Sequence, residues 1–231
     1  MFIAGMQKLT LLDFPGVVAC TLFTAGCNFR CPWCHNAGLV LPEENPDLLE
    51  GDEVLSFLEK RKGVLDGVCV TGGEPLLQAE LPEFLRRVKD LGYRVKLDTN
   101  GSFPERLEAL VREKLVDRVA MDIKNGPSRY AETAGLRDLD LSAVTASKDF
   151  LLSDPVDYEF RTTVVRGLHT AESLLEAADW ITGAKQWFLQ QFKDSGNLIH
   201  GEGLSAFTDG EMQALLETVQ KKIPAAQLRG I

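Results

Sequence analysis

Short apolar runs rich in β-branched residues alternate with amphipathic stretches, and this alternation restricts the possible fold more than any other feature of the chain. Such alternation is typical of a parallel sheet covered by helices. We predict six strands, at Val17–Thr24, Val68–Thr71, Arg94–Thr99, Arg118–Met121, Glu159–Val165 and Gln186–Gln191. Six parallel strands are fewer than the eight of a closed barrel. The sequence therefore predicts an α/β fold, a partial (β/α)6 TIM-like barrel that is open on one side.

The domain organisation follows from the absence of dividing segments in the sequence. The 231 residues contain no internal repeat, low-complexity tract or Pro/Gly-rich linker, so we expect one domain over residues 1–231. Two connections are long, Gly38–Glu50 with Pro42 and Pro46, and Ser195–Gly203. Long connections in compact domains are usually functional.

The charge balance disfavours some classes of partner. The chain has 25 Lys and Arg against 34 Asp and Glu, a formal charge of −9. This charge repels phosphate backbones and anionic lipid, so we expect no nucleic acid and no membrane surface as a partner. The N-terminus lacks the features of a signal peptide, and no window approaches about 18 consecutive apolar residues. We therefore expect a cytoplasmic protein.

Polar residues gather where the predicted strands end. In barrels and open α/β sheets, the chemistry lies at the carboxyl ends of the strands. The segments found there are Ala25–Cys27, Thr71–Pro75, Asp98–Gly101, Asp122–Lys124, Arg161 and Gln190–Gln191. We expect the functional residues among them.

Three of the five cysteines, Cys27, Cys31 and Cys34, form C-x3-C-x2-C directly after the first predicted strand. In a cytosolic chain, such clustering indicates metal or redox chemistry. Three thiolates can hold three irons of a [4Fe-4S] cube, which ordinarily takes four, and the fourth iron is then open to a small ligand. Cys20 and Cys69 lie inside apolar strands, and we expect them to be buried.

Two other interpretations of the cysteine segment stay open. Cys31-Pro32-Trp33-Cys34 has the spacing of a thioredoxin-type dithiol, and the three cysteines with His35 could form a zinc site. The dithiol interpretation leaves Cys27 unexplained. The zinc interpretation crowds four ligands into nine residues. We favour the iron–sulfur cluster.

With Trp33 as the aromatic residue, C-x3-C-x-aromatic-C resembles the cluster motif of the radical S-adenosylmethionine enzymes. The resemblance implies that Cys27, Cys31 and Cys34 hold a catalytic [4Fe-4S] cluster, and that Trp33 lies beside the cofactor. In that family the open iron chelates the amino and carboxylate groups of S-adenosylmethionine. One electron then cleaves the sulfonium to methionine and a 5′-deoxyadenosyl radical.

Two further motifs are similar to those of the glycyl-radical-enzyme activases within this family. Gly72-Gly73-Glu74 resembles a segment whose backbone carbonyls accept hydrogen bonds from the methionine ammonium, and glycines allow such a close approach. Asp98-Thr99-Asn100-Gly101 resembles a motif whose aspartate also holds that ammonium. The resemblance thus implies that Gly72, Gly73, Glu74, Asp98 and Asn100 contact the cofactor.

A third motif, Asp122-Ile123-Lys124, resembles the activases' D-x-K. By that likeness Lys124 pairs with the methionine carboxylate and Asp122 contacts the ribose hydroxyls. The spacing puts both side chains on one face of an extended strand end. Without the family likeness, these residues would be a solvated pair, and Gly72-Gly73 and Asn100-Gly101 would be turns.

The resemblance extends over nearly the whole chain and is closest to the activating proteins of anaerobic ribonucleoside-triphosphate reductase. It implies an oxidoreductase in anaerobic cytoplasm that abstracts a hydrogen atom from a glycine of that reductase. It also implies a low-potential electron donor such as flavodoxin or ferredoxin. Two departures are Phe192, near the place of a histidine in the activase for pyruvate formate-lyase, and Val165-Arg166-Gly167, where related chains often have V-P-G.

Two competing functions stay open. One is a small-molecule radical enzyme such as a carboxydeazaguanine synthase, which shares the short (β/α)6 core. The other is a non-catalytic iron–sulfur electron carrier or thiol switch, which would not need the polar residues at the strand ends. The role of Arg161 is also open, because Glu159 on the same face could be a structural partner. We expect His169 and His200 at the surface.

Overall fold

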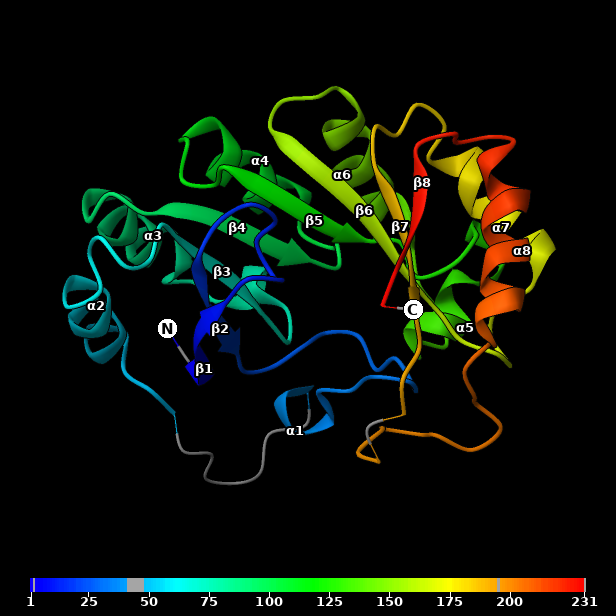
Figure 1. Cartoon of the computed structure of the whole chain (residues 1–231), viewed down its shortest axis with the longest axis horizontal. Coiled ribbons are helices and arrows are strands. Elements are labelled where there is room, and N and C mark those ends of the chain that lie inside the picture. The colour runs from blue at the N-terminus through cyan, green and yellow to red at the C-terminus, as the bar shows by residue number, and fades with distance from the viewer. Residues whose placement is uncertain (2, 41–47, 195, 231) are drawn as a thin grey trace. The chain divides into compact units, whose positions relative to one another are not determined.

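The computed structural model describes residues 1, 3–40, 48–194 and 196–230, in which strands and helices alternate (Figure 1). The strands are β1 (Ile3–Thr10), β2 (Ala19–Thr24), β3 (Gly67–Gly72), β4 (Arg94–Thr99), β5 (Arg118–Asp122), β6 (Asp157–Val164), β7 (Trp187–Gln191) and β8 (Ala226–Arg229). The α-helices are α1 (Ala37–Val40), α2 (Gly51–Glu59), α3 (Leu81–Asp90), α4 (Pro104–Arg112), α5 (Tyr130–Ala134), α6 (Ser142–Leu152), α7 (Ala171–Trp180) and α8 (Asp209–Gln220). Two 3₁₀ turns are η1 (Pro75–Leu77) and η2 (Pro127–Arg129).

All six predicted strands are present, as β2 to β7, with ends that differ by a few residues. The predicted count of six is nevertheless too low, because the described part of the chain also contains β1 and β8. β1 pairs antiparallel with β2, and its burial does not alternate in the way that identifies a strand in a sequence. β8 has only four residues, fewer than a periodic pattern needs.

The described chain divides into two compact units. The N-terminal unit comprises residues 1–28, 38–120 and 155–157, and the C-terminal unit comprises residues 29–37, 121–154 and 158–231. The boundary within β5 lies between Ala120 and Met121. The single domain expected over residues 1–231 stays a prediction.

In the N-terminal unit, strands β1 to β4 lie in chain order. β2, β3 and β4 are parallel, with Cys20 beside Val68 and Val68 beside Val95. All three residues are fully buried, as is Cys69, so the predicted burial of Cys20 and Cys69 is confirmed. Burial raises the pKa of the Cys20 thiol to about 12, which keeps it protonated and unreactive. The parallel register brings the carboxyl ends of these strands to one edge.

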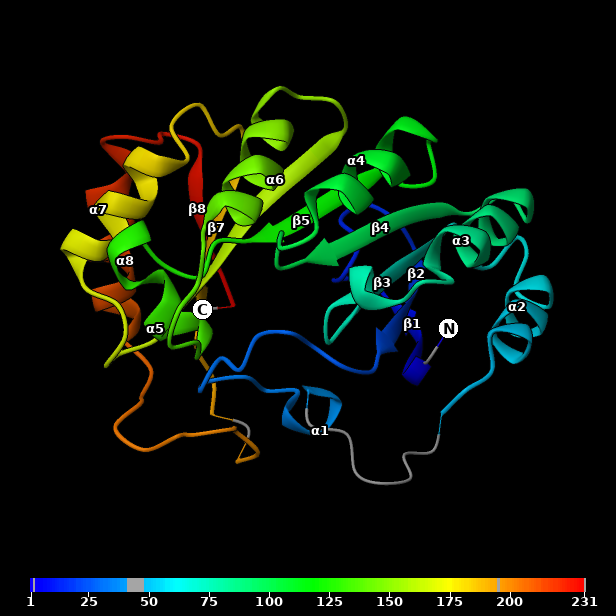
Figure 2. The same ribbon diagram turned by 180° about the vertical axis from the view of Figure 1, so that it is seen from behind.

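In the C-terminal unit, β6, β7 and β8 are parallel and adjacent. One face of these strands is apolar and fully buried, with Phe160 and Val164 from β6 and Trp187 and Leu189 from β7. Helix α6 lies across one side of β6 (Figure 2). Helices α7 and α8 each begin with a capping box, which satisfies backbone N–H groups that the first turn leaves unpaired.

Part of each long connection lies outside the described residues. Residues 41–47, including Pro42 and Pro46, and residue 195 are not described. Among the helices that are described, none is long and apolar enough to cross a membrane.

Candidate functional site

The residues predicted to form the site are shared between the two units. The N-terminal unit holds Cys27, Gly72, Gly73, Glu74, Asp98 and Asn100, and the C-terminal unit holds Cys31, Trp33, Cys34, Asp122 and Lys124. Across the described ranges, no three His, Cys, Asp or Glu side chains are arranged to hold a metal ion. Ligation of a cluster by the three cysteines stays a prediction.

The glycine pair after β3 is required by close packing of the backbone. Gly72 has φ +114°, and a Cβ there would lie 2.4 Å from the Thr24 nitrogen. A Cβ on Gly73 would lie 1.9 Å from the Gly26 carbonyl oxygen. The Gly73 N–H donates to the Thr24 carbonyl at 2.9 Å. Any side chain would therefore push apart the segments that follow β2 and β3.

The Glu74 side chain connects the end of β3 to the end of β4 through hydrogen bonds. Its fully buried carboxylate accepts hydrogen bonds from the Leu76 N–H at 3.0 Å, the Thr99 hydroxyl at 2.8 Å and the Asn100 N–H at 2.7 Å. A buried carboxylate needs such donors to offset its lost hydration. The Glu74 side chain thus supports the loop, while the predicted cofactor contact concerns its backbone.

Asp98 is buried beside a lysine that the sequence analysis missed. The Lys96 ammonium, which is 1% exposed, pairs with the Asp98 carboxylate and lies 3.9 Å from the Cys69 sulfur. The i, i+2 spacing of Lys96 and Asp98 is the sequence signal for this pair, since it places both side chains on one face of β4. Asp98 therefore has a cationic partner within the protein.

The Asn100 side chain joins the loop after β4 to the first cysteine. Its amide nitrogen donates to Asn28 Oδ1 at 2.9 Å and contacts Cys27 Sγ at 3.9 Å. Its amide oxygen accepts from the Ser102 N–H at 2.9 Å and the Ser102 hydroxyl at 2.6 Å. Two of these four contacts thus hold Cys27 and Asn28, and the two contacts with Ser102 fix the orientation of the Asn100 amide.

In the C-terminal unit, the cysteine segment is folded tightly against α5. The Cys34 N–H donates to the Cys31 carbonyl at 3.0 Å, which forms a turn between these residues. The Arg30 N–H donates to the Ala134 carbonyl at 2.9 Å. Gly135 has φ +69°, and a Cβ there would lie 1.9 Å from the Arg30 oxygen. Residue 135 must therefore be glycine for this approach.

Trp33 and Lys124 lie together beside this turn. The Lys124 ammonium is 5.0 Å from the centroid of the Trp33 ring, within the range of a cation–π interaction. Trp33 is buried, and its Nε1 has no hydrogen-bond partner among the described residues. Because a buried donor without an acceptor is costly, this N–H marks a place that suits an acceptor from a bound group.

The buried Lys124 forms an ion pair with Asp122, which is partly exposed and also pairs with Arg161. The Lys124 ammonium is 2.9 Å from Asp122 Oδ2, and Arg161 Nη2 is 2.9 Å from Asp122 Oδ1. Glu159 binds Arg229 at 2.6 Å, and the suggested pairing of Glu159 with Arg161 stays a prediction. β8, which supplies Arg229, was not predicted, so this partner could not be identified.

The charges in this group fix its protonation. Burial opposes ionisation of Asp122, but the nearby Lys124 and Arg161 cations prevail and lower its pKa to about 2. Burial also disfavours the charged form of Lys124, yet the Asp122 carboxylate and the Cys31 thiolate raise the pKa of Lys124 above its ordinary value. At neutral pH, both members of the pair are charged.

The expected surface position of His169 is wrong. His169 is 3% exposed, its Nδ1 accepts from the Val165 N–H at 3.1 Å, and its Nε2 lies 2.8 Å from the Lys124 carbonyl. With Nδ1 as an acceptor, Nε2 carries the proton and donates to that carbonyl. Burial lowers the pKa of His169 to about 4. His200 is exposed, as predicted.

The two departures from the family pattern have structural roles. Phe192 is buried, and its ring centroid is 5.5 Å from that of His35. Arg166 pairs with Glu211 at 2.5 Å and lies 4.5 Å from the centroid of the Phe207 ring. Arg166 thus anchors the segment that precedes α8.

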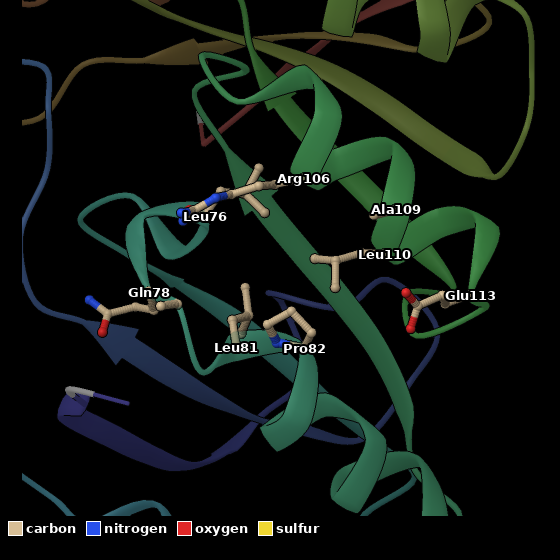
Figure 3. A pocket seen from close by; sticks show the side chains of 9 residues that line it. Leu76, Gln78, Leu81, Pro82, Arg106, Ala109, Leu110 and Glu113 are labelled. Atoms are coloured by element: carbon tan, nitrogen blue, oxygen red, sulfur yellow. The ribbon is translucent and has the colours of Figure 1, made fainter.

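A pocket of about 180 Å³ lies in the N-terminal unit between η1, α3 and α4 (Figure 3). Leu76, Leu81 and Leu110 are among the residues that line it. Arg106 from α4 extends across it and donates to the Leu76 carbonyl. None of the predicted site residues lines this pocket.

Comparison with known sequences identifies two kinds of relative. A profile of the Radical SAM superfamily matches residues 21–146. A protein of Methanocaldococcus jannaschii, provisionally named a glycyl-radical enzyme activating enzyme, is 30% identical over 195 residues, which cover 83% of this chain and 80% of that protein. A 7-carboxy-7-deazaguanine synthase of Methanopyrus kandleri is 29% identical over 172 residues, covering 63% of this chain and 66% of that enzyme.

Comparison with solved structures concerns the fold. Streptococcus suis SuiB bound to S-adenosylmethionine matches 89% of this chain with a TM-score of 0.69 and 14% identity. The chain spans about half of SuiB, since the match covers 48% of that protein. This likeness confirms the predicted fold class, an α/β fold of the partial (β/α)6 barrel type.

Proposed function

Because the chain belongs to the Radical SAM superfamily, we propose that it is a glycyl-radical enzyme activase. Members of the superfamily use a [4Fe-4S] cluster and S-adenosylmethionine. The proposed reaction removes a hydrogen atom from the Cα of one glycine in a partner enzyme. The observation that carries this proposal is the likeness to the M. jannaschii protein, which extends over 83% of this chain and 80% of that protein.

The residues present suit these cofactors. Cys27, Cys31 and Cys34 supply the three thiolates of the cluster, and Trp33, between Cys31 and Cys34 in the sequence, provides an unpaired Nε1 donor. Lys124 supplies a cation that Asp122 keeps charged. When bound, the cluster would supply one electron, and S-adenosylmethionine would supply the group that takes the hydrogen atom.

The chain's own residues bind and orient the nucleoside. We propose that Lys124 pairs with the methionine carboxylate and that Asp122 contacts the ribose. Asp98 and the backbone of Gly72, Gly73 and Glu74 would meet the ammonium. Asn100 contributes by holding Cys27, since its amide contacts the Cys27 sulfur at 3.9 Å.

The proposed activity also indicates a partner enzyme, an electron donor and a cellular location. We favour anaerobic ribonucleoside-triphosphate reductase as the glycyl-radical enzyme, with flavodoxin or ferredoxin as the electron donor. The protein would act as an oxidoreductase in anaerobic cytoplasm, because oxygen destroys a glycyl radical. The whole-chain resemblance to reductase activases supports this choice.

The cluster is tested by anaerobic reconstitution of single variants. We expect one [4Fe-4S] cluster in the wild-type protein and no low-field iron signal after replacement of Cys27, Cys31 or Cys34 by alanine. Cys20→Ala and Cys69→Ala are the matched controls and should retain the signal, because both residues are buried within strands. Zinc in place of iron after anaerobic isolation would contradict the proposal.

The activity is tested with the reductase from the same cell. The reduced protein with S-adenosylmethionine should produce a glycine-centred doublet in electron paramagnetic resonance, with one 5′-deoxyadenosine formed per radical. The second candidate is a carboxydeazaguanine synthase, which the 29% identity to the M. kandleri enzyme favours. Turnover of a small metabolite without radical transfer to any glycyl enzyme would replace the first function by the second.

A further inference from the structure

The C-terminal unit carries a row of three polar side chains that the proposed cofactor contacts do not use. Thr163 in β6 is the register partner of Gln190 in β7, and Gln190 is the register partner of Arg229 in β8. Register partners in a sheet direct their side chains to the same face. All three are intermediate in exposure. They therefore form a partly accessible row across three strands.

This row lies on the same face as a proposed cofactor contact. Thr163 follows Arg161 by two residues, so both side chains leave β6 on one face. Arg161 Nη2 contacts Asp122 at 2.9 Å. The opposite face of these strands carries fully buried apolar side chains such as Phe160 and Leu189. A group held by this row would lie next to the cofactor and one step nearer the carboxyl ends of the strands.

The charged groups on this face are already paired. Arg229 forms two hydrogen bonds with Glu159, at 2.6 and 3.1 Å, and its guanidinium carbon lies 3.7 Å from the centroid of the Phe188 ring. Arg161 is bound to Asp122. A substrate carboxylate would have to compete with Glu159 or Asp122 for these cations. The face is therefore poorly suited to a charged metabolite.

Thr163 and Gln190 differ from these arginines, because they carry no charge and their side chains are not already paired within the described residues. Their side chains are uncharged, and neither makes a hydrogen bond to any residue within 1, 3–40, 48–194 and 196–230. A carboxamide offers two donors and an acceptor, and a hydroxyl offers a donor and an acceptor. The two adjacent side chains thus present the hydrogen-bonding groups that pair with an amide.

We propose that Thr163 and Gln190 bind the main chain of the substrate segment that contains the target glycine. This inference rests on the proposed function and names its substrate class, a neutral peptide segment. Glycine has no side chain to recognise, so a protein must read its peptide N–H and C=O groups. The carboxamide of Gln190 matches both groups, and the Thr163 hydroxyl lies beside it.

The test uses Gln190→Ala and Thr163→Val, with Gln213→Ala on the exposed side of α8 as the matched control. The probe is the anaerobic ribonucleotide reductase from the same cell. Loss of one hydrogen bond should raise the KM for the reductase about five- to tenfold in each of the first two variants. The Kd of the cluster-free protein for the reductase should rise by a similar factor. The affinity for S-adenosylmethionine should not change.

Gln190→Glu keeps the size of the side chain but replaces its N–H donor with a charge. We expect it to weaken reductase binding at least as much as Gln190→Ala, because the added carboxylate repels a peptide carbonyl. Equal thermal midpoints of the variants and the wild-type protein would establish that folding is intact. The partly exposed positions of both residues favour that result.

The outcomes separate the inference from the function on which it rests. Unchanged KM and Kd in the Gln190 and Thr163 variants, with an active wild-type protein, would overturn the inference alone. A fall in affinity for S-adenosylmethionine at constant reductase affinity would also overturn it and assign these side chains to the cofactor. If the wild-type protein forms no glycyl radical on the reductase, the proposed function fails and the inference fails with it.

Discussion

The buried His169 should make the stability of this protein depend on pH in a defined window. Burial lowers the pKa of His169 from 6.5 to about 4 in the folded state. Below pH 6.5, the unfolded chain therefore binds a proton that the folded chain does not take up until about pH 4. Stability contributed by neutral His169 is complete above pH 6.5 and is lost as the pH falls toward 4. At about 1.36 kcal/mol for each pH unit between the two values, the loss approaches about 3 kcal/mol.

The perturbation is His169→Gln, which has no titrating group but retains an N–H donor for the Lys124 carbonyl. Urea unfolding of the cluster-free, reduced protein at several pH values from 4.5 to 7.5 measures the free energy of unfolding. We expect the wild-type protein to lose stability more steeply than the variant below pH 6.5. Asp122, with a pKa of about 2, contributes mainly below this window.

His200→Gln is the matched control, because His200 is exposed. The pKa of His35 is also lowered by burial, so His35 adds to the slope with the same sign in all three proteins. The difference between the wild-type protein and His169→Gln isolates His169. Parallel pH profiles for these two proteins would refute the assignment of His169 as a neutral, buried donor.

Three further perturbations test the site. Lys124→Ala should weaken S-adenosylmethionine binding about ten- to a hundredfold in calorimetry, from the loss of a charge-assisted hydrogen bond; unchanged affinity would show that Lys124 does not meet the carboxylate. Lys96→Met should lower the free energy of unfolding by about 3 to 5 kcal/mol because it leaves Asp98 buried without its cation, and the double variant with Asp98→Leu should recover much of that loss in urea denaturation; a loss in the double variant equal to the sum of the two single losses would mean that the pair is not coupled. Gly73→Ala should lower the thermal midpoint, since its Cβ would lie 1.9 Å from the Gly26 oxygen; an unchanged midpoint would contradict the close packing of these segments.

Local sequence patterns predicted the main elements correctly. Short runs with apolar and β-branched residues identify β2 to β7, because amphipathic stretches separate them in the sequence. The sequence patterns do not predict β1 and β8, since the burial of β1 is irregular and β8 has only four residues. The cysteine spacing and the polar residues at the strand ends are also local patterns, so the sequence alone predicts a candidate site there, and its role stays a prediction.

The sequence by itself determined which residues stand at the ends of the strands, because periodicity and spacing act within one segment. Only the tertiary structure decided which groups they meet. Arg161 binds Asp122 from β5, and Glu159 binds Arg229 from β8, although the two residues are neighbours on one face of β6. His169, without any local pattern, is buried against the Lys124 backbone. These pairings depend on strand register and on burial, which raises the cost of an unpaired charge, and both are set by contacts between residues far apart in the sequence.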